Sequence, residues 1–423
     1  MANNFDSNFT RKLARVFLEK FDSERVLSKN VNTQLLKGKF DPSTGSNVDF
    51  KRPTDYTSVR TAAGDISSNS ASDIITGKAT GTVQNYFTAH VNYNEADEAI
   101  KMDQLDQLLA PMATRIKTDL EVDFADYMMK NCNLVAGSVG QGVSTWDHVA
   151  EAGALMQSVG VPMDAAWCYA VNPWTQRSLA SNQRSLSSGP DSLVGSAHER
   201  AVITRNFAGF DVMTATTLSS YTTGSGADFA GVVASNPDVT YVTAKDTFTQ
   251  TIAVSGITAS LAIPAGQPVT IARNRLNLST RQTILDETGT AVTFTGVVTE
   301  AATANGSGEA TITIAGPAIF ESAGAYNTTS AAVVSGDVIT FGGAQNTTIQ
   351  PNLFWHPQAF AIGSVPMKKL NSTDTIATTE DGLQFRVSKG TSFLENKQLV
   401  RFDFRPAYAT LNPFFAGQSY GYT

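Results

Sequence analysis

Apolar residues recur at helical spacing near the start of the chain. They occupy positions i, i+4, i+7, i+8 and i+12 of one face and comprise Phe9, Leu13, Val16, Phe17 and Phe21. This pattern predicts an amphipathic helix over 9–27, with Asn8 as its N-cap. A helix at the end of a chain has little core of its own. We therefore expect it either to fold back or to pack on another subunit.

The next segment, 37–78, is rich in Ser, Thr and Asp and predicts a long exposed excursion with a short strand at NVDFKR. The stretch TVQNYFTAHVNY at 82–93 alternates between apolar and polar residues and predicts a further strand. Its apolar face comprises Val83, Phe87, Ala89, Val91 and Tyr93. Because a long two-stranded arm is marginal in isolation, we expect this arm to lie on a neighbouring molecule.

Residues 95–131 carry apolar side chains that step by three and four, which predicts one unusually long helix. At 1.5 Å per residue such a helix is about 50 Å long. Pro111 should kink it or divide it in two. A helix of this length is typical of a spine that crosses a flat domain.

Helices and short strands then alternate up to about residue 221. A helix is predicted over 145–160, opened by Thr145 and closed by Gly160. The stretch 165–180 reads as a buried strand, a turn and a short helix, and 205–218 reads as a strand pair around a Gly turn. This alternation favours an α+β fold.

Between 222 and 347 the pattern changes to short alternating strands separated by Gly, Pro or Asn turns. The strand candidates are VTYVTA, FTQTIAVSG, QPVTIAR, AVTFTGVVT, EATITIAG and DVITFGG. Tryptophan is absent from this segment but present on both sides of it, at Trp146, Trp167, Trp174 and Trp355. We therefore interpret 222–347 as an all-β domain, a β-sandwich or a barrel, inserted into an α+β domain whose parts are 95–221 and 348–423.

The mixed pattern resumes after residue 347 with NLFWHPQAFAI and two further strand candidates, LQFRVSKG and QLVRFDFRPAYATL. Val400, Phe402 and Phe404 share one face of the second.

The composition narrows the possible functions. Charged residues make up 16% of the chain, against roughly 25% in typical soluble domains. The net charge is −7, without a basic stripe, which disfavours a dedicated nucleic-acid binder. Cys132 and Cys168 form no CxxC pair, so a Cys-based metal or redox site is not expected. We find neither a signal peptide nor a run of 18 apolar residues, and expect a soluble protein made in the cytoplasm.

No catalytic motif stands out. The histidines at 90, 148, 198 and 356 do not pair at i+3 or i+4, and no phosphate loop or nucleophile elbow occurs. We read His356, beside Trp355 and Pro357, as a packed structural residue. The carboxylates of the long helix favour a solvated face or an interface over an ion site. We therefore predict no enzyme, no catalytic residue, no metal and no cofactor.

The order of these elements resembles one family. An N-terminal helix, a long polar loop with NVDFKR and TVQNYFTAHVNY, the spine EADEAIKMDQLDQLLAPMATRIKTDLEVDFADYMMKN, an inserted β domain and the return NLFWHPQAFAIGSVPM follow in turn. This looks like the major capsid protein of short-tailed double-stranded DNA phages (the podovirus type). Its HK97-like fold carries an Ig-like insertion domain, and the resemblance covers essentially the whole chain.

The resemblance implies a domain plan. Residues 1–36 would form the N-terminal arm, 37–94 the extended loop and P-domain strands, and 95–131 the spine helix. The segments 132–221 and 348–423 would form the P- and A-domain core around the insertion at 222–347.

The resemblance also implies a function. Hexamers and pentamers would build an icosahedral shell, of T=7 type in relatives, although the sequence alone does not give its size. A scaffolding protein and a portal protein would be partners, and the shell would enclose double-stranded DNA without sequence-specific binding. The protein would be a virion component assembled in the host bacterial cytoplasm.

Two sets of contact residues follow from the resemblance alone. Glu19, Asp22 and Glu24 would contact the scaffold, and Arg273 and Arg275 would contact neighbouring capsomers. Two alternatives stay open: a surface or adhesion protein whose β domain binds glycan, and an enzyme with an unrecognised site within 132–221.

Overall fold

A computed structural model describes residues 5–40, 45–68, 73–94, 105–186, 201, 203, 206–226, 229–392 and 397–422. The chain divides into two compact units, each assembled from three separate segments. Unit 1 comprises Met1–Asp49, Thr80–Ala125 and Phe360–Ala409, and unit 2 comprises Phe50–Ala79, Asp126–Ala359 and Thr410–Thr423. Helices and strands are mixed in the chain, which confirms the predicted α+β class.

The larger sheet of unit 1 is antiparallel, in the order β20 (Thr375–Thr378), β21 (Gln384–Ser392), β22 (Lys397–Phe404) and β3 (Phe87–Asn94). Its inner face carries Val400, Phe402 and Phe404, each no more than 1% exposed. The alternation predicted for β22 is therefore confirmed.

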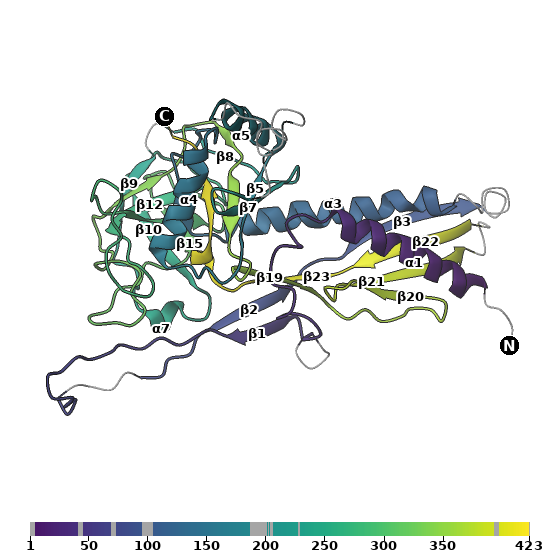
Figure 1. Cartoon of the computed structure of the whole chain (residues 1–423), viewed down its shortest axis with the longest axis horizontal. Helices are drawn as coiled ribbons and strands as arrows, with labels where there is room; N and C mark the ends of the chain where they lie inside the picture. Colours follow the sequence, from purple (N-terminus) through teal and green to yellow (C-terminus); the bar gives the residue numbers. More distant parts are fainter. Residues whose placement is uncertain are drawn as a thin grey trace. The chain divides into compact units, whose positions relative to one another are not determined.

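Helix α1 (Phe5–Glu24) packs on β20 and β21 of this sheet (Figure 1). Phe17 stacks on Phe402 with ring centroids 4.8 Å apart, and Phe21 meets the edge of Phe385 at 4.5 Å. The helix thus folds back onto its own chain, one of the two outcomes expected from the sequence. It begins at Phe5, so Asn8 lies inside the helix and the prediction of an Asn8 N-cap is wrong.

Helix α3 (Leu105–Lys130) continues through Pro111, so the predicted division at this proline does not occur. The predicted first part of the helix, 95–104, lies outside the described residues. Glu121 of α3 is 2% exposed and accepts hydrogen bonds from the backbone N–H groups of Leu27 (2.7 Å) and Ser28 (3.1 Å). The segment after α1 is therefore fastened to α3 by a buried carboxylate.

The second sheet of unit 1 has the order β1 (Asn47–Lys51), β2 (Lys78–Val83), β23 (Pro406–Thr410) and β19 (Phe360–Ser364). The stretch 82–93, predicted as one strand, is divided between β2 and β3 in different sheets. At the break, Arg405 donates to the Gln84 carbonyl (3.2 Å) and lies 4.9 Å from the Tyr86 ring centroid. These contacts hold the chain where it changes sheet.

Unit 2 contains a six-stranded mixed sheet. Its order is β4 (Leu134–Ala136), β24 (Ala416–Ser419), β18 (Asn352–Trp355), β5 (Trp167–Val171), β7 (Phe210–Thr214) and β6 (Asn206–Phe207). Helix α4 (Trp146–Val159) starts at the N-cap Thr145 and ends at Gly160, whose φ of 93° suits glycine. Helix α5 (Pro173–Leu186) follows β5. The helices α4 and α5 and the strands β5, β6, β7 and β18 lie in segments where the sequence predicted them, whereas β4 and β24 were not predicted.

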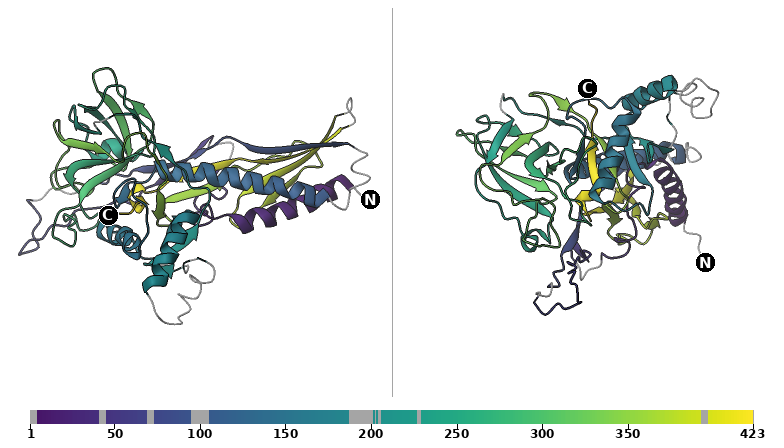
Figure 2. Two further views of the ribbon diagram at one scale, coloured as in Figure 1. Left: turned by 90° about the horizontal axis from the view of Figure 1, so that it is seen from above. Right: turned by 60° about the vertical axis from the view of Figure 1, so that its left-hand side comes forward.

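The segment 222–347 forms a closed barrel, which Figure 2 shows most clearly. Its strands, in order around the barrel, are β10 (Thr249–Ser255), β15 (Ala310–Ala315), β13 (Thr293–Val298), β12 (Pro268–Asn274), β16 (Val338–Phe341) and β9 (Ala230–Val233). The short strands β11 (Ala262–Ile263) and β14 (Ala302–Thr303) pair beside it. Where the segment begins and ends, β8 (Tyr221–Thr222) pairs with β17 (Thr348–Ile349), so its two ends lie together.

One predicted strand of the barrel is wrong. VTYVTA contains the short helix α7 (Tyr241–Ala244) instead. The Asp238 carboxylate accepts hydrogen bonds from the Thr240 N–H (2.9 Å) and the Thr243 hydroxyl (2.7 Å). These hydrogen bonds stabilise a helical turn, although Val and Thr by themselves prefer β-strands. In the described part of the chain, no helix has the length and apolar character needed to span a membrane.

A buried charge cluster connects three strands of the larger unit 1 sheet. Asp403 is fully buried and accepts hydrogen bonds from Arg386 (Nε, 3.1 Å), Arg401 (Nε, 2.6 Å) and Thr88 (Oγ1, 2.7 Å). Burial alone would raise the pKa of Asp403, but these donors outweigh burial and hold the pKa below its ordinary value. The ionised carboxylate therefore stabilises the folded state.

We expect the Asp403 contribution to be present above the unfolded-state pKa of about 3.9 and to be lost as the pH falls through the lower folded-state pKa. Asp403→Asn should lower the free energy of unfolding at pH 7 by roughly 3 kcal/mol, because the buried Arg386 loses its anion. In this variant the free energy of unfolding should also fall less steeply as the pH is lowered into the acid range. Urea unfolding at several pH values checks this. Asp119→Asn, at an exposed ion pair, is the control and should change little. An unchanged acid limb in Asp403→Asn would contradict the assignment.

Candidate assembly surfaces

The residues predicted to contact a scaffold lie on α1. Glu19 is exposed, as are Arg11 and Arg15 on the same helix. Asp22 and Glu24 belong to α1, but their side chains lie outside the described part of the structure. The described surface of the arm therefore combines acidic and basic groups.

Arg273, predicted to contact another capsomer, is partly exposed and paired within its own unit. Its guanidinium donates two hydrogen bonds to Asp337, Nε to Oδ2 at 2.7 Å and a terminal nitrogen to Oδ1 at 2.6 Å. The Asp337 Oδ2 also accepts from the Val334 N–H at 2.9 Å. This bidentate pair holds β12 against the turn before β16.

Arg275 lies in a different environment from Arg273. It is 2% exposed and donates to the Asn133 Oδ1 (2.8 Å) and the Thr295 carbonyl (2.8 Å). Its guanidinium carbon lies 4.7 Å from the Phe294 ring centroid, and burial lowers its pKa to about 9. The prediction that Arg275 reaches a neighbouring capsomer does not fit this burial, whereas Arg273 remains a candidate.

The contact between Arg275 and Asn133 joins the barrel to the mixed sheet. The Asn133 amide nitrogen donates to the Ala315 carbonyl at 2.7 Å and to the Gly316 carbonyl at 3.2 Å. One side chain next to β4 thus binds the β12 end and the β15 end of the barrel. The barrel is fixed to the rest of unit 2 by these polar contacts.

The sequence did not reveal how the long loop is anchored. Between β1 and β2 the described residues 52–68 and 73–77 form no helix or strand, and Figure 1 shows them as a long excursion. The Tyr326 hydroxyl accepts from the Asp55 N–H (2.9 Å) and donates to the Ile75 carbonyl (3.2 Å). One tyrosine therefore binds both the outgoing and the returning arm of the loop.

Aromatic and cationic groups complete this anchor. The Tyr326 ring stacks on Tyr241 with centroids 3.6 Å apart, and Arg281 forms an ion pair with Asp55. Arg52 lies 4.2 Å from the Phe248 ring centroid and donates to the Lys78 carbonyl at 3.0 Å. Burial lowers the pKa of Arg52 to about 10. The base of the loop is thus held on the barrel within unit 2.

The outer part of the loop exposes large apolar side chains. They are Tyr56, Val59, Ile66 and Ile74, exposed by 53%, 48%, 62% and 74%. A segment that presents several apolar groups to water is typical of an interaction surface.

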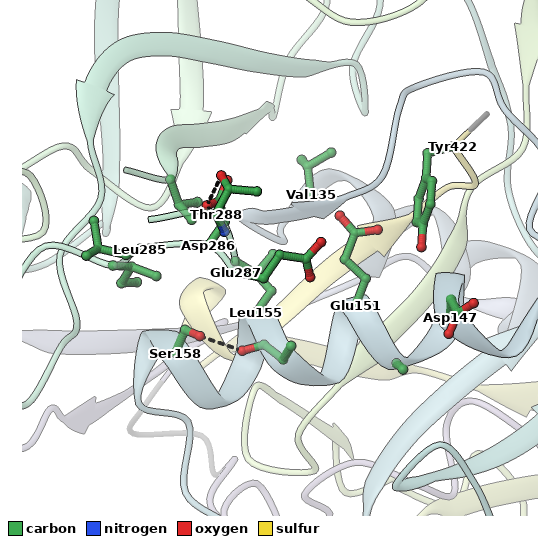
Figure 3. A pocket seen from close by; sticks show the side chains of 14 residues that line it. Val135, Asp147, Glu151, Leu155, Ser158, Leu285, Asp286, Glu287, Thr288 and Tyr422 are labelled. Carbon is green, nitrogen blue, oxygen red and sulfur yellow. Dashed lines mark hydrogen bonds between the residues drawn. The ribbon is translucent and has the colours of Figure 1, made fainter. Parts of the chain in front are cut away.

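An acidic groove of about 790 Å³ lies between α4 and the segment 284–292 (Figure 3). Asp147, Glu151, Asp286 and Glu287 line it, together with Tyr422. Burial raises the pKa of Glu151 above its ordinary value, and the nearby Glu287 carboxylate raises it further. The Asp286 carboxylate accepts hydrogen bonds from the Thr288 hydroxyl and the Thr290 N–H within the same turn. The groove suits a cationic side chain.

A smaller apolar pocket of about 290 Å³ lies on α4 and the segment around Met163. It shares the lining residues Ala150 and Ala154 with the acidic groove. On α5, the side chain of Trp174 is 75% exposed.

The two buried histidines in the described part of the chain show no catalytic arrangement, and His198 lies outside the described residues. His356 is fully buried, and its Nε2 lies 2.8 Å from the Asp164 carboxylate, in keeping with a packed structural residue. His148 is buried in α4, where its Nδ1 accepts from the Ser144 N–H at 3.1 Å. Among the residues that the structure describes, no group of three or more His, Cys, Asp or Glu could hold a metal ion.

Comparison with known proteins identifies relatives of this chain. Residues 1–421 match the family model described as P22 coat protein, gene protein 5. The major capsid protein of Acyrthosiphon pisum secondary endosymbiont phage 1 is 35% identical over 427 residues, which cover 100% of both chains. Among solved structures, one from Mycobacterium phage Che8 is 12% identical, with a TM-score of 0.47, over 93% of this chain and 90% of that one. The capsid structure of cyanophage P-SCSP1u is 8% identical, with a TM-score of 0.41, over 90% and 84%.

The loop anchor leads to a prediction. Tyr326→Phe removes the hydroxyl that binds both arms while it keeps the ring stacked on Tyr241. At about 1 kcal/mol for each lost hydrogen bond, amide exchange in 52–60 and 73–79 should quicken by roughly fivefold or more. Hydrogen–deuterium exchange of the unassembled protein measures this. Tyr422→Phe, away from the loop, is the control. Equal exchange in Tyr326→Phe and the wild type would contradict the anchor.

Proposed function

Because this chain belongs to the P22 coat protein family, which it matches over residues 1–421, we propose that its exposed segments bind further copies of itself in an icosahedral shell. The family match and the 35% identity to a major capsid protein show that this chain is a structural capsid protein of a phage. It is a virion component and not an enzyme. Both alternatives left open by the sequence, the adhesion protein and the enzyme, are overturned by this match.

The observation that carries the proposal is the anchored loop. Its base is held by Tyr326, Arg281 and Arg52, while its outer part exposes Tyr56, Val59, Ile66 and Ile74. A loop ordered at its base loses less conformational entropy on binding than a free chain segment. We infer that the loop lies on a neighbouring copy, whose surface covers these apolar groups.

We propose that the chain follows the HK97-like plan. The N-terminal arm is 1–36, the extended loop with its strands 37–94, the spine helix 95–131, and the core 132–221 with 348–423. The insertion is 222–347, and two features support it. Its strands close on themselves as a barrel, and β8 pairs with β17 where it begins and ends. Of the two expected forms, the barrel is the one that occurs, and it differs from the two-sheet sandwich of an Ig-like domain.

We also propose the partners that the resemblance implies. A scaffolding protein contacts the arm at Glu19, Asp22 and Glu24, and a portal protein occupies one vertex. Assembly takes place in the host cytoplasm, and the shell, of T=7 type, encloses double-stranded DNA. The exposure of Glu19 supports a contact at the arm, and the partial exposure of Arg273 supports a contact with another capsomer.

Electron microscopy of the overexpressed protein, with and without a co-expressed scaffold, tests the shell. We expect wild-type shells or polyheads, and only unassembled folded protein from the triple variant Val59→Ser, Ile66→Ser and Ile74→Ser. The control carries three Ser substitutions at exposed apolar positions outside the loop, Val242, Val338 and Leu370. Normal shells from the loop variant would refute the role of the loop. A wild type that forms only a small oligomer would refute the shell.

Expression of 222–347 alone tests the insertion. Because the barrel closes on itself and its ends are paired, we expect a cooperative thermal unfolding transition and a dispersed NMR spectrum. Ile252→Ala, at a fully buried barrel position, should lower the melting temperature markedly, because the cavity costs about 2–5 kcal/mol. A disordered spectrum of the wild-type segment would show that it is not an independent domain.

A further inference from the structure

Trp174 is an exposed indole on a rigid base. It stands in the first turn of α5, directly after Pro173, and is 75% exposed. The Asn172 Oδ1 accepts from the Thr175 N–H at 2.7 Å and caps the helix. Leu179, about one and a half turns further on, is fully buried and fixes the helix to unit 2. The indole is therefore held out into solvent on an ordered backbone.

A pocket of matching character lies elsewhere on the same unit. The apolar pocket of about 290 Å³ is bordered by Trp146 (45% exposed) and Met163 (73% exposed). Its remaining lining is mostly small residues: Ala150, Gly153, Ala154, Ala165, Ala166, Ala208 and Gly209. Because small side chains leave the space empty, the pocket is large enough for one aromatic ring, whose offset or edge packing adds to area burial.

Trp174 does not fill this pocket in its own chain. It is not among the residues that line the pocket, and its exposure shows that it packs on little else. A projection and a hollow that do not fill each other within one subunit can form the two halves of a heterologous contact between subunits. Repetition of such a contact closes a ring of subunits.

The charges around both features are complementary. Arg177 follows Trp174 by three residues on α5, so the two share a helix face, and Arg177 is exposed. Asp147 and Glu151 of α4 line the acidic groove (Figure 3). The groove shares the lining residues Ala150 and Ala154 with the pocket. An indole that enters the pocket therefore brings a guanidinium toward carboxylates.

We propose that Trp174 of one copy inserts into the α4 pocket of a neighbouring copy, with Arg177 beside Asp147 and Glu151. The proposal rests on the proposed shell function and names one contact within it. Tryptophan and arginine are the residue types that most often dominate interface energies, and a buried aromatic anchor with a charged rim is their usual arrangement.

Two variants test the contact from both sides. Trp174→Ala removes the projection, and Ala154→Leu fills the pocket at an exposed helical position without changing the core. We expect each to raise the protein concentration needed for shell assembly by tenfold or more, as seen by light scattering and electron microscopy. Because both remove the same contact, the double variant should lose little more than either single variant. Leu370→Ala, exposed and outside both features, is the control, and thermal unfolding verifies that every variant is folded.

Cross-linking identifies the occupant. Trp174→Cys and Ala154→Cys are placed on two differently tagged chains and assembled together. The native Cys132 and Cys168 are buried. A disulfide between the two tags supports the contact. Normal assembly of all variants without this cross-link overturns the contact and leaves the shell function intact, whereas a wild type that forms no shells overturns both.

Discussion

The core of unit 2 depends on β18, a strand that follows the whole barrel segment in the sequence. Strand β18 pairs with β5 on one side and β24 on the other, and Phe354 and Trp355 are fully buried there. Between β5 and β18 the chain passes through the whole barrel. Strand β18 can therefore pair with β5 only if the two ends of the barrel segment lie close together. The pairing of β8 with β17 holds these ends together. Loop-closure entropy rises only slowly with length, so a folded domain with adjacent ends is a tolerable interruption.

The same interruption supports the long loop. Tyr326 and Arg281, which bind the loop, belong to the barrel segment, and Arg275 and Asn133 fix the barrel to the mixed sheet. Arg275 is held by neutral oxygens and an aromatic ring face in a buried site, an arrangement that costs desolvation energy and favours one docking geometry over others. The barrel thus connects the core to the segment that reaches outward, and a change in its docking would move the base of the loop.

Local patterns predicted most of the elements, and contacts distant in sequence decided the rest. Helix α4 was predictable because Thr145 and Gly160 mark its ends, and β22 because its apolar residues alternate. The turn at VTYVTA was missed because Asp238, outside that pattern, accepts hydrogen bonds from Thr240 and Thr243. Pairs such as Asp55 with Tyr326 or Arg275 with Asn133 join residues far apart in the chain, for which no local pattern exists. The surface role of Trp174 likewise became visible only once its exposure was known.

The loop and Trp174 are two exposed apolar features that are suited to binding for the same physical reason. Both the loop and Trp174 project from ordered backbone, so binding costs them little further entropy. The apolar side chains of both stay largely exposed within their own unit. Such a subunit can bury these apolar groups only against another copy. Because the projecting group and the surface that receives it are different parts of the subunit, each contact leaves one of the two unused and able to bind a further copy. Growth then stops only when the arrangement closes, which is the geometric condition for a shell. The low charge content, 16% of residues, suits a surface that is largely covered in this way.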